Sequence, residues 1–78
     1  MHLQILTPEK NLFEGEITGV QLPGEDGSFE ILNNHAPMIA SLSNGRVRVN
    51  AKDESKPRYF TVESGFVEVL DKKVVVLV

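Results

Sequence analysis

The chain has 78 residues, a net charge of −3 and no cysteine, which predicts one small domain over residues 1–78 and excludes disulfides and thiolate metal ligands. The negative charge argues against nucleic acid as the main partner. No apolar run reaches the ~18 residues of a membrane-spanning helix and no secretory leader is present, so we expect a cytosolic domain without direct membrane insertion.

Short runs of alternating apolar and polar residues follow one another along the chain and predict β-strands with one buried side. The residues expected to point inward are Leu3 and Ile5, Val20 and Leu22, Phe29 and Ile31, Val47 and Val49, Phe60 and Val62, and Val67 and Val69. Polar segments rich in turn-forming residues separate the runs at 8–11, 23–27, 43–45, 52–57 and 71–73. Many short strands without helical periodicity predict an all-β sandwich or barrel.

Individual residues refine this prediction. The Asn44-Gly45 pair is a strong signal for a tight hairpin turn, because a type I′ turn needs positive φ at both positions. Gly15 and Gly19 interrupt strand-like sequence and predict bulges or close approach of a neighbouring backbone.

No residue pattern indicates catalysis, and we expect no catalytic, metal-binding or cofactor-binding residues. His2 and His35 are the only histidines and do not have metal-ligand spacing. Glu25 and Asp26 lie side by side in a Gly-flanked turn, where carboxylates are ordinary turn residues. Ser28 lacks the Gly-x-Ser-x-Gly elbow of hydrolases, and no phosphate-binding loop is present. The residues alone therefore predict a non-catalytic β module that works through protein contacts.

Residues 27–39 carry the most distinctive pattern, in which an apolar strand enters a polar corner stiffened by Pro37 and a second apolar run follows. This stretch resembles the signature loop of the epsilon subunit of F-type ATP synthases, whose mitochondrial counterpart is called delta. Segments 12–15 (Leu-Phe-Glu-Gly), 64–69 (Ser-Gly-Phe-Val-Glu-Val) and 74–78 (Val-Val-Val-Leu-Val) are similar to the family in the same order. The resemblance implies a two-sheet antiparallel β-sandwich.

The resemblance also implies a non-catalytic central-stalk subunit that links the gamma subunit to the polar loops of the c-ring and supports coupling of ion flow to ATP synthesis. Such a subunit lies peripherally at the cytoplasmic face of the bacterial inner membrane. The c-ring contact maps onto Glu25, Asp26, Gly27 and Ser28. The gamma contact maps onto His35, Ala36, Pro37 and Met38 in the corner, and onto Ala40 and Leu42 in the strand that follows.

Many members of this family continue into a C-terminal helical hairpin that inhibits ATP hydrolysis or binds ATP. The 78 residues contain no such helical segment, so we expect neither ATP binding nor inhibition by an extended hairpin. Two alternatives remain open from the residues. One is a generic β-sandwich adaptor that binds a protein by a sheet edge. The other is a small sugar- or ligand-binding enzyme, which needs a pocket of convergent polar groups.

Overall fold

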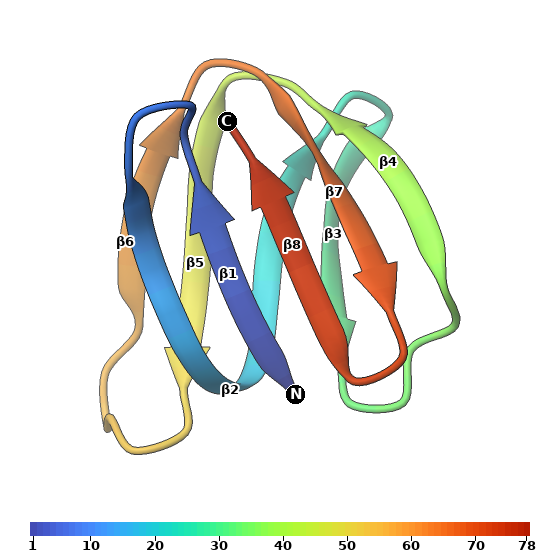
Figure 1. The fold of residues 1–78 in the computed structure, drawn as a ribbon. Helices are drawn as coiled ribbons and strands as arrows, with labels where there is room; N and C mark the ends of the chain where they lie inside the picture. The colour runs from blue at the N-terminus through green and yellow to red at the C-terminus, as the bar shows by residue number, and fades with distance from the viewer.

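The computed structural model describes all 78 residues, and its eight strands form two packed layers (Figure 1). The strands are β1 (His2–Leu6), β2 (Asn11–Gly24), β3 (Gly27–Leu32), β4 (Met38–Leu42), β5 (Gly45–Ala51), β6 (Arg58–Val62), β7 (Gly65–Leu70) and β8 (Lys73–Leu77). The predicted all-β sandwich is thus confirmed. None of these elements is a helix long and apolar enough to cross a membrane.

Strand β2 is 14 residues long and belongs to both layers. Its first half pairs with β1, and its second half pairs with β3 on one side and β5 on the other. The front layer in Figure 1 therefore runs β4-β7-β8-β1-β2, and the back layer runs β3-β2-β5-β6. The register against β5 shifts between Ile17 and Gly19, which marks a bulge where β2 passes from one layer to the other.

The prediction for Gly19 is confirmed, because it lies at this bulge. Gly15 is different. It pairs with Leu3 in regular register, and a Cβ would meet nothing closer than the Phe13 ring at 3.5 Å. The prediction of a bulge or close approach at Gly15 is therefore wrong.

Neighbouring strands pair antiparallel with one exception. β1 and β8 run parallel, with His2 beside Lys73 at one end and Leu6 beside Leu77 at the other. The predicted antiparallel sandwich holds for every strand pair except this one. Alternation along a strand shows which side is buried but carries no information on the direction of its neighbour.

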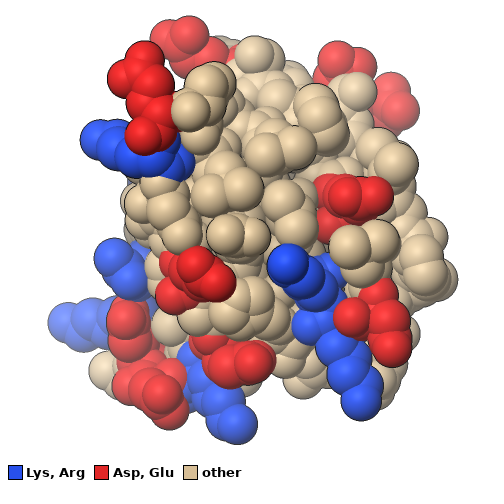
Figure 2. Space-filling model, in the orientation of Figure 1, with Lys and Arg blue, Asp and Glu red and all other residues tan.

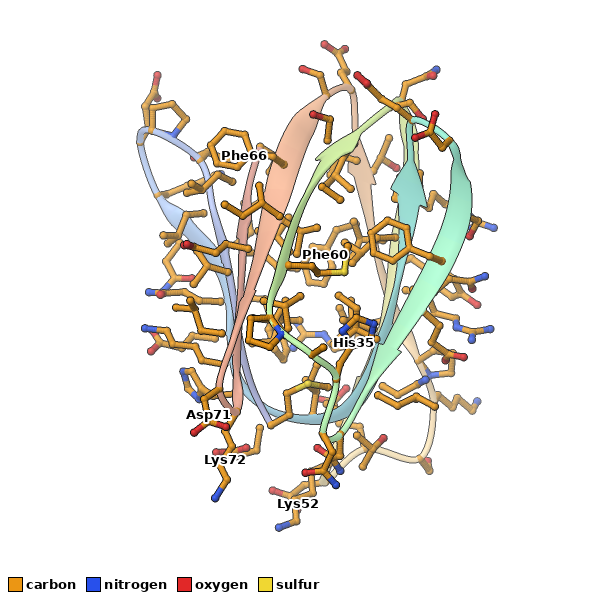
Figure 3. All side chains as sticks on the ribbon, turned by 90° about the vertical axis from the view of Figure 1, so that its right-hand side faces the viewer. His35, Lys52, Phe60, Phe66, Asp71 and Lys72 are labelled. Carbon is orange, nitrogen blue, oxygen red and sulfur yellow. The ribbon has the colours of Figure 1, made fainter.

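The core consists of one cluster of buried side chains between the layers, visible in Figure 3. Its members are Leu3, Ile5, Phe13, Ile17, Val20, Leu22, Ile31, Leu42, Val47, Val49, Val62, Val67, Val69, Val74 and Val76. Every inward residue predicted from alternation belongs to this cluster or, for Phe29 and Phe60, packs against it half-buried. The period-two pattern therefore identified the buried side of each strand.

An aromatic and arginine cluster covers the core where β6 comes close to the first half of β2. The rings of Phe13 and Phe60 pack edge to face, with centroids 6.0 Å apart. The Arg58 guanidinium lies over both rings, 5.2 Å from the Phe13 centroid and 5.7 Å from that of Phe60. Such cation–π contacts leave the charge in water while the side-chain stem covers apolar surface.

The predicted hairpin at Asn44-Gly45 is wrong. β4 pairs with β7 and meets β2 only where Leu42 lies opposite Gly24, whereas β5 pairs with β2 and β6. Residues 43–44 thus cross between the layers and do not connect paired strands. Of this pair of residues, only Gly45 has positive φ. A Cβ at Gly45 would lie 2.8 Å from Cβ of Pro23, so the glycine allows β5 to approach β2 closely.

Candidate functional site

Both groups of predicted contact residues lie on one side of the sandwich, which faces the viewer in Figure 3. We call this side the open edge and define it as the corner 33–37, strand β4 and the turn 25–28. The corner joins β3 to β4, and β4 ends beside the turn, where the Glu25 amide donates to the Ser41 carbonyl at 3.1 Å. The corner and the acidic turn therefore lie at opposite ends of β3, with β4 between them.

A shallow hollow separates β4 from the acidic turn. Residues 24–29 form one wall, and residues 38–41 form the other. Phe29, Met38 and Ala40 are half-buried there and pack against the core, so the floor of the hollow is apolar. Its carboxylates, Glu25 and Asp26, are exposed and form no ion pair within the chain. An exposed acidic pair beside an apolar floor is suited to a protein partner with a basic residue.

The corner itself is shaped by main-chain conformation. Asn34 has φ of 69°, the left-handed conformation that asparagine tolerates. The His35 Nδ1 donates to the Ala36 carbonyl at 2.7 Å, which fixes the imidazole against its own loop. His35, Ala36 and Pro37 are all exposed and available for contact.

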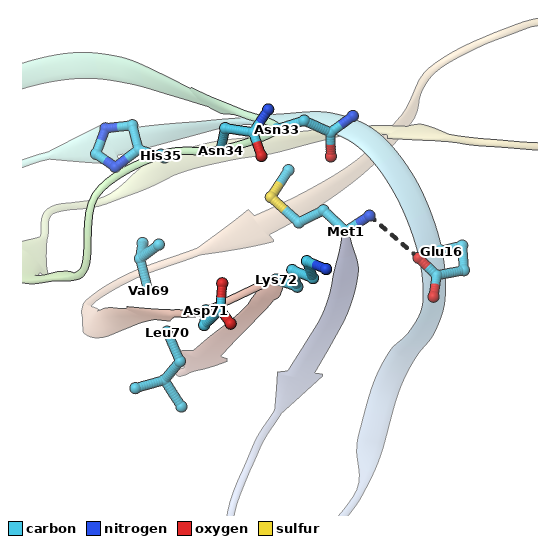
Figure 4. Close-up of a pocket in the computed structure, with 9 residues that line it drawn as sticks. All are labelled: Met1, Glu16, Asn33, Asn34, His35, Val69, Leu70, Asp71 and Lys72. Atoms are coloured by element: carbon cyan, nitrogen blue, oxygen red, sulfur yellow. Dashed lines mark ion pairs between the residues drawn. The ribbon is translucent and has the colours of Figure 1, made fainter.

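A second hollow lies below the corner, at the end of the sandwich where the N-terminus and the β7–β8 turn meet (Figure 4). His35, Asn34, Asp71 and Lys72 contribute to its walls, and the Met1 amine pairs there with Glu16 at 3.2 Å. The structure contains no cluster of three or more metal-ligating side chains. His35, the one histidine of this hollow, is hydrogen-bonded through Nδ1 to a main-chain carbonyl.

The structure corrects one predicted gamma-contact residue. Leu42 is only 2% exposed and belongs to the core, so its side chain cannot meet a partner. Met38 and Ala40 share its inward side of β4 and are half-buried. The outward side of this strand carries Ile39, which is 71% exposed, and Ser41. A shift of one position along a strand reverses which side of the sheet a residue faces.

The outer side of the front layer carries an apolar surface that sequence reasoning missed. Four of the six exposed large hydrophobic residues lie there and define what we call the apolar face: Ile39, Phe66, Leu70 and Leu77. Phe66 lies between Ser41 and Leu77 in the strand register, and Ile39 lies opposite Glu68, so one carboxylate stands among these apolar residues. Figure 2 shows this side with uncharged atoms across its upper centre and charged side chains around them. Exposed apolar surface of this kind marks interaction sites.

A charged group borders the front layer at β1 and β2. His2 Nε2 lies 3.1 Å from Glu14 Oε2, and Asn11 donates to the other carboxylate oxygen at 2.9 Å. These two hydrogen bonds, the one from His2 first, hold the pKa of Glu14 below its ordinary value of 4.5. A depressed carboxylate pKa contributes stability above the ordinary value, and this contribution is lost as pH falls through the folded-state value.

We therefore expect Glu14→Gln to lower the urea midpoint at pH 6, with the difference from the parent closing as the pH falls below 4.5. Glu9→Gln is the matched control, because the Glu9 carboxylate makes no hydrogen bond or ion pair and should show no such closing gap. A Glu14→Gln difference that is the same at pH 6 and pH 3 would contradict the role assigned to ionised Glu14.

Comparison with known protein families gives the decisive observation. The family model described as ATP synthase, Delta/Epsilon chain, beta-sandwich domain matches residues 1–78. The chain belongs to this family. Its members named ATP synthase epsilon chain include one from Chlorobium limicola, 45% identical over 75 residues, which cover 96% of this chain and 84% of that relative. Another, from Caulobacter vibrioides, is 41% identical over 69 residues, 88% of this chain and 78% of the relative.

Solved structures share the fold of this epsilon-family chain. A chain of the Euglena gracilis mitochondrial ATP synthase, in a structure of OSCP, F1 and c-ring, matches with a TM-score of 0.87 at 18% identity. A chain of the Tetrahymena thermophila mitochondrial ATP synthase, in a structure of central stalk and c-ring, matches with a TM-score of 0.77 at 21% identity. This chain spans 48% and 61% of those two chains. The epsilon chain is a non-catalytic subunit, so family membership confirms the expectation that the chain is not an enzyme.

Proposed function

We propose that this chain links the gamma subunit of a rotary ATP synthase to the polar loops of the c-ring and so supports coupling of ion flow to ATP synthesis. It would do so peripherally, at the cytoplasmic face of a bacterial inner membrane. The observation that carries the proposal is the arrangement around β4. Ile39 on this strand belongs both to the apolar face and to the open edge that ends in the acidic turn.

The apolar face is suited to the gamma subunit. Phe66 and Leu77 lie opposite each other on paired strands, and Ile39 lies opposite Glu68, one diagonal step from Phe66. Burying such apolar surface yields about 25 cal/mol for each Å². His35, Ala36 and Pro37 extend this surface at the corner. Met38 and Ala40 support it from the core side and are no longer proposed as direct contacts.

The acidic turn is suited to a basic loop of the c-ring. Glu25, Asp26, Gly27 and Ser28 are exposed, and Gln21 donates to Ser28 Oγ at 3.2 Å, which ties the turn to β2. Exposed ion pairs contribute only about 0–1 kcal/mol each and are screened by salt. The turn would therefore orient and accelerate docking more than it would add affinity.

The test is binding to the gamma and c subunits of the same organism. Ile39→Asp should weaken gamma binding at least about tenfold, because a carboxylate would lose its hydration in the contact. Leu32→Asp is the matched control, since Leu32 is 53% exposed on the back layer. The double change Glu25→Gln with Asp26→Asn should leave gamma binding intact and weaken association with the c-ring, most clearly at low salt.

Equal gamma binding by Ile39→Asp and the parent would show that gamma does not cover the apolar face. Absence of binding to both subunits would favour the generic sandwich adaptor. Fluorescence polarisation of labelled parent and variant chains gives the dissociation constants, and far-ultraviolet circular dichroism shows whether each variant is folded.

A further inference from the structure

The outer side of the back layer carries two arginines beside an exposed tyrosine. Strand register aligns Glu30, Gln21, Arg48 and Tyr59 across β3, β2, β5 and β6. Arg46 precedes Arg48 by two residues and therefore lies on the same side of β5. We call Arg46, Arg48 and Tyr59 the arginine face. It lies on the opposite side of the sandwich from the apolar face, because the two are outer sides of different layers.

Arg46 is held in place without a carboxylate partner. Its guanidinium carbon lies 4.6 Å from the centroid of the Tyr59 ring, within cation–π distance. None of the five ion pairs in the chain involves Arg46. Tyr59 is 50% exposed, so the stacked pair stands at the surface with its hydrogen-bond donors free. Arginine and tyrosine in this arrangement are typical of the residues that dominate binding energy at protein interfaces.

Arg48 is only partly satisfied. Its Nη2 lies 3.4 Å from Glu30 Oε2, a long contact between groups that are both over one-third exposed. Its Nε is the one buried side-chain polar atom of the structure without a hydrogen-bond partner. Of the two guanidinium groups, only that of Arg48 has a carboxylate partner. The buried Arg48 Nε is out of reach of a partner, so an arriving acceptor would be bound by the exposed guanidinium ends of Arg46 and Arg48.

We infer that the arginine face binds an extended acidic segment of a partner protein, one with Asp or Glu at alternate positions. Side chains two residues apart on a strand are separated by about 6.5 Å, and an extended segment repeats its side chains with the same spacing. Two carboxylates of such a segment therefore face Arg46 and Arg48, whose planar forks match carboxylates in bidentate geometry. Tyr59, opposite Arg48 on β6, supplies an apolar surface beside them.

Two features favour a protein segment over an anionic membrane. Basic clusters that bind lipid surfaces have about four to eight lysines or arginines, whereas this face has two. Glu30 lies in the same cross-strand row as Arg48 and would repel a dense layer of anionic headgroups. A single acidic segment placed along β5 would be separated from Glu30 by β2. Because the apolar face is on the other layer, this partner would bind together with the gamma subunit and does not depend on it.

The test uses the chain itself and a synthetic octapeptide in which Glu alternates with Thr, with both ends blocked. In a ¹H–¹⁵N correlation titration at low salt, we expect amide shifts in β5 and β6 and none for a peptide with Gln in place of Glu. Arg46→Gln with Arg48→Gln should weaken binding about tenfold, and Arg46→Gln alone, which breaks no ion pair, about threefold. Lys72→Gln with Lys73→Gln removes the same charge elsewhere and should change affinity less than twofold.

The double change Arg46→Lys with Arg48→Lys keeps both positive charges but removes the planar guanidinium groups. It should weaken peptide binding several-fold. If this variant binds the peptide as the parent does, or if the Lys72 and Lys73 changes weaken binding as much as the arginine changes, binding depends on net charge alone. Either result would overturn the inference. So would binding to phosphatidylglycerol vesicles without binding to the peptide. The apolar face is untouched in these variants, so gamma binding remains an independent measurement.

Discussion

Replacing Gly65 with alanine is expected to lower the free energy of unfolding by about 3 kcal/mol or more, a large part of the stability of a small domain. Gly65 has φ of 143°, a conformation that side chains disfavour. A Cβ there would also clash with the Leu77 carbonyl oxygen. This oxygen belongs to β8, which is paired with β7 from Phe66 onward, so it cannot retreat without breaking the ladder.

Gly27→Ala is the matched control for this prediction. Gly27 also has positive φ, 120°, but a Cβ there would meet no atom within 4 Å. Gly27→Ala should therefore lower the free energy of unfolding only by the backbone strain of this conformation, about 1–2 kcal/mol. Urea unfolding followed by circular dichroism gives both values. Equal losses for the two variants would show that the close approach of β8 to Gly65 does not constrain this position.

Ile31→Ala is expected to cost about 3 kcal/mol, within the range of 2–5 kcal/mol for truncating a buried isoleucine. Ile31 is fully buried and lies opposite Val20. Its strand, β3, has β2 as its only partner, so the Ile31 side chain is a principal attachment of β3 to the core. The acidic turn and the corner are the two ends of β3, and both should lose order with it.

The control is Leu32→Ala, which truncates the neighbouring residue on the exposed side of β3 and should cost less than about 1 kcal/mol. Urea unfolding measures the stability difference, and amide hydrogen exchange measures the opening of residues 25–37. A loss of stability without faster exchange in those residues would contradict the role of Ile31 as the attachment of β3.

The sequence predicted burial better than connectivity. Alternation at Leu3 and Ile5, or at Val67 and Val69, directly reflects the geometry of a strand with one buried side. Pairing is a non-local property, and for that reason the parallel contact of β1 with β8 left no local signal. Asn44-Gly45 has the composition of a hairpin, but the route of the chain between layers overrode this local preference.

The sequence predicted part of the candidate site, and the residues that were missed show a recognisable pattern in the sequence. The corner and the acidic turn were identified by resemblance, whereas Phe66, Leu70 and Leu77 were not. These three residues occupy outward positions that flank the inward valines of β7 and β8. A solvated strand would have polar residues there, so an apolar run such as 74–78 indicates a strand with both sides covered. The same alternation would have placed Leu42 in the core and Ile39 outside.

The passage of β2 through both layers has a mechanical consequence. Two sheets held together only by side-chain packing can slide or twist against each other, because that packing has no fixed direction. Here one continuous backbone, hydrogen-bonded on both sides of its bend, joins the layers covalently. In the proposed role, a torque applied by the shaft to the front layer would pass through this backbone to the acidic turn, and the domain would rotate as one stiff body.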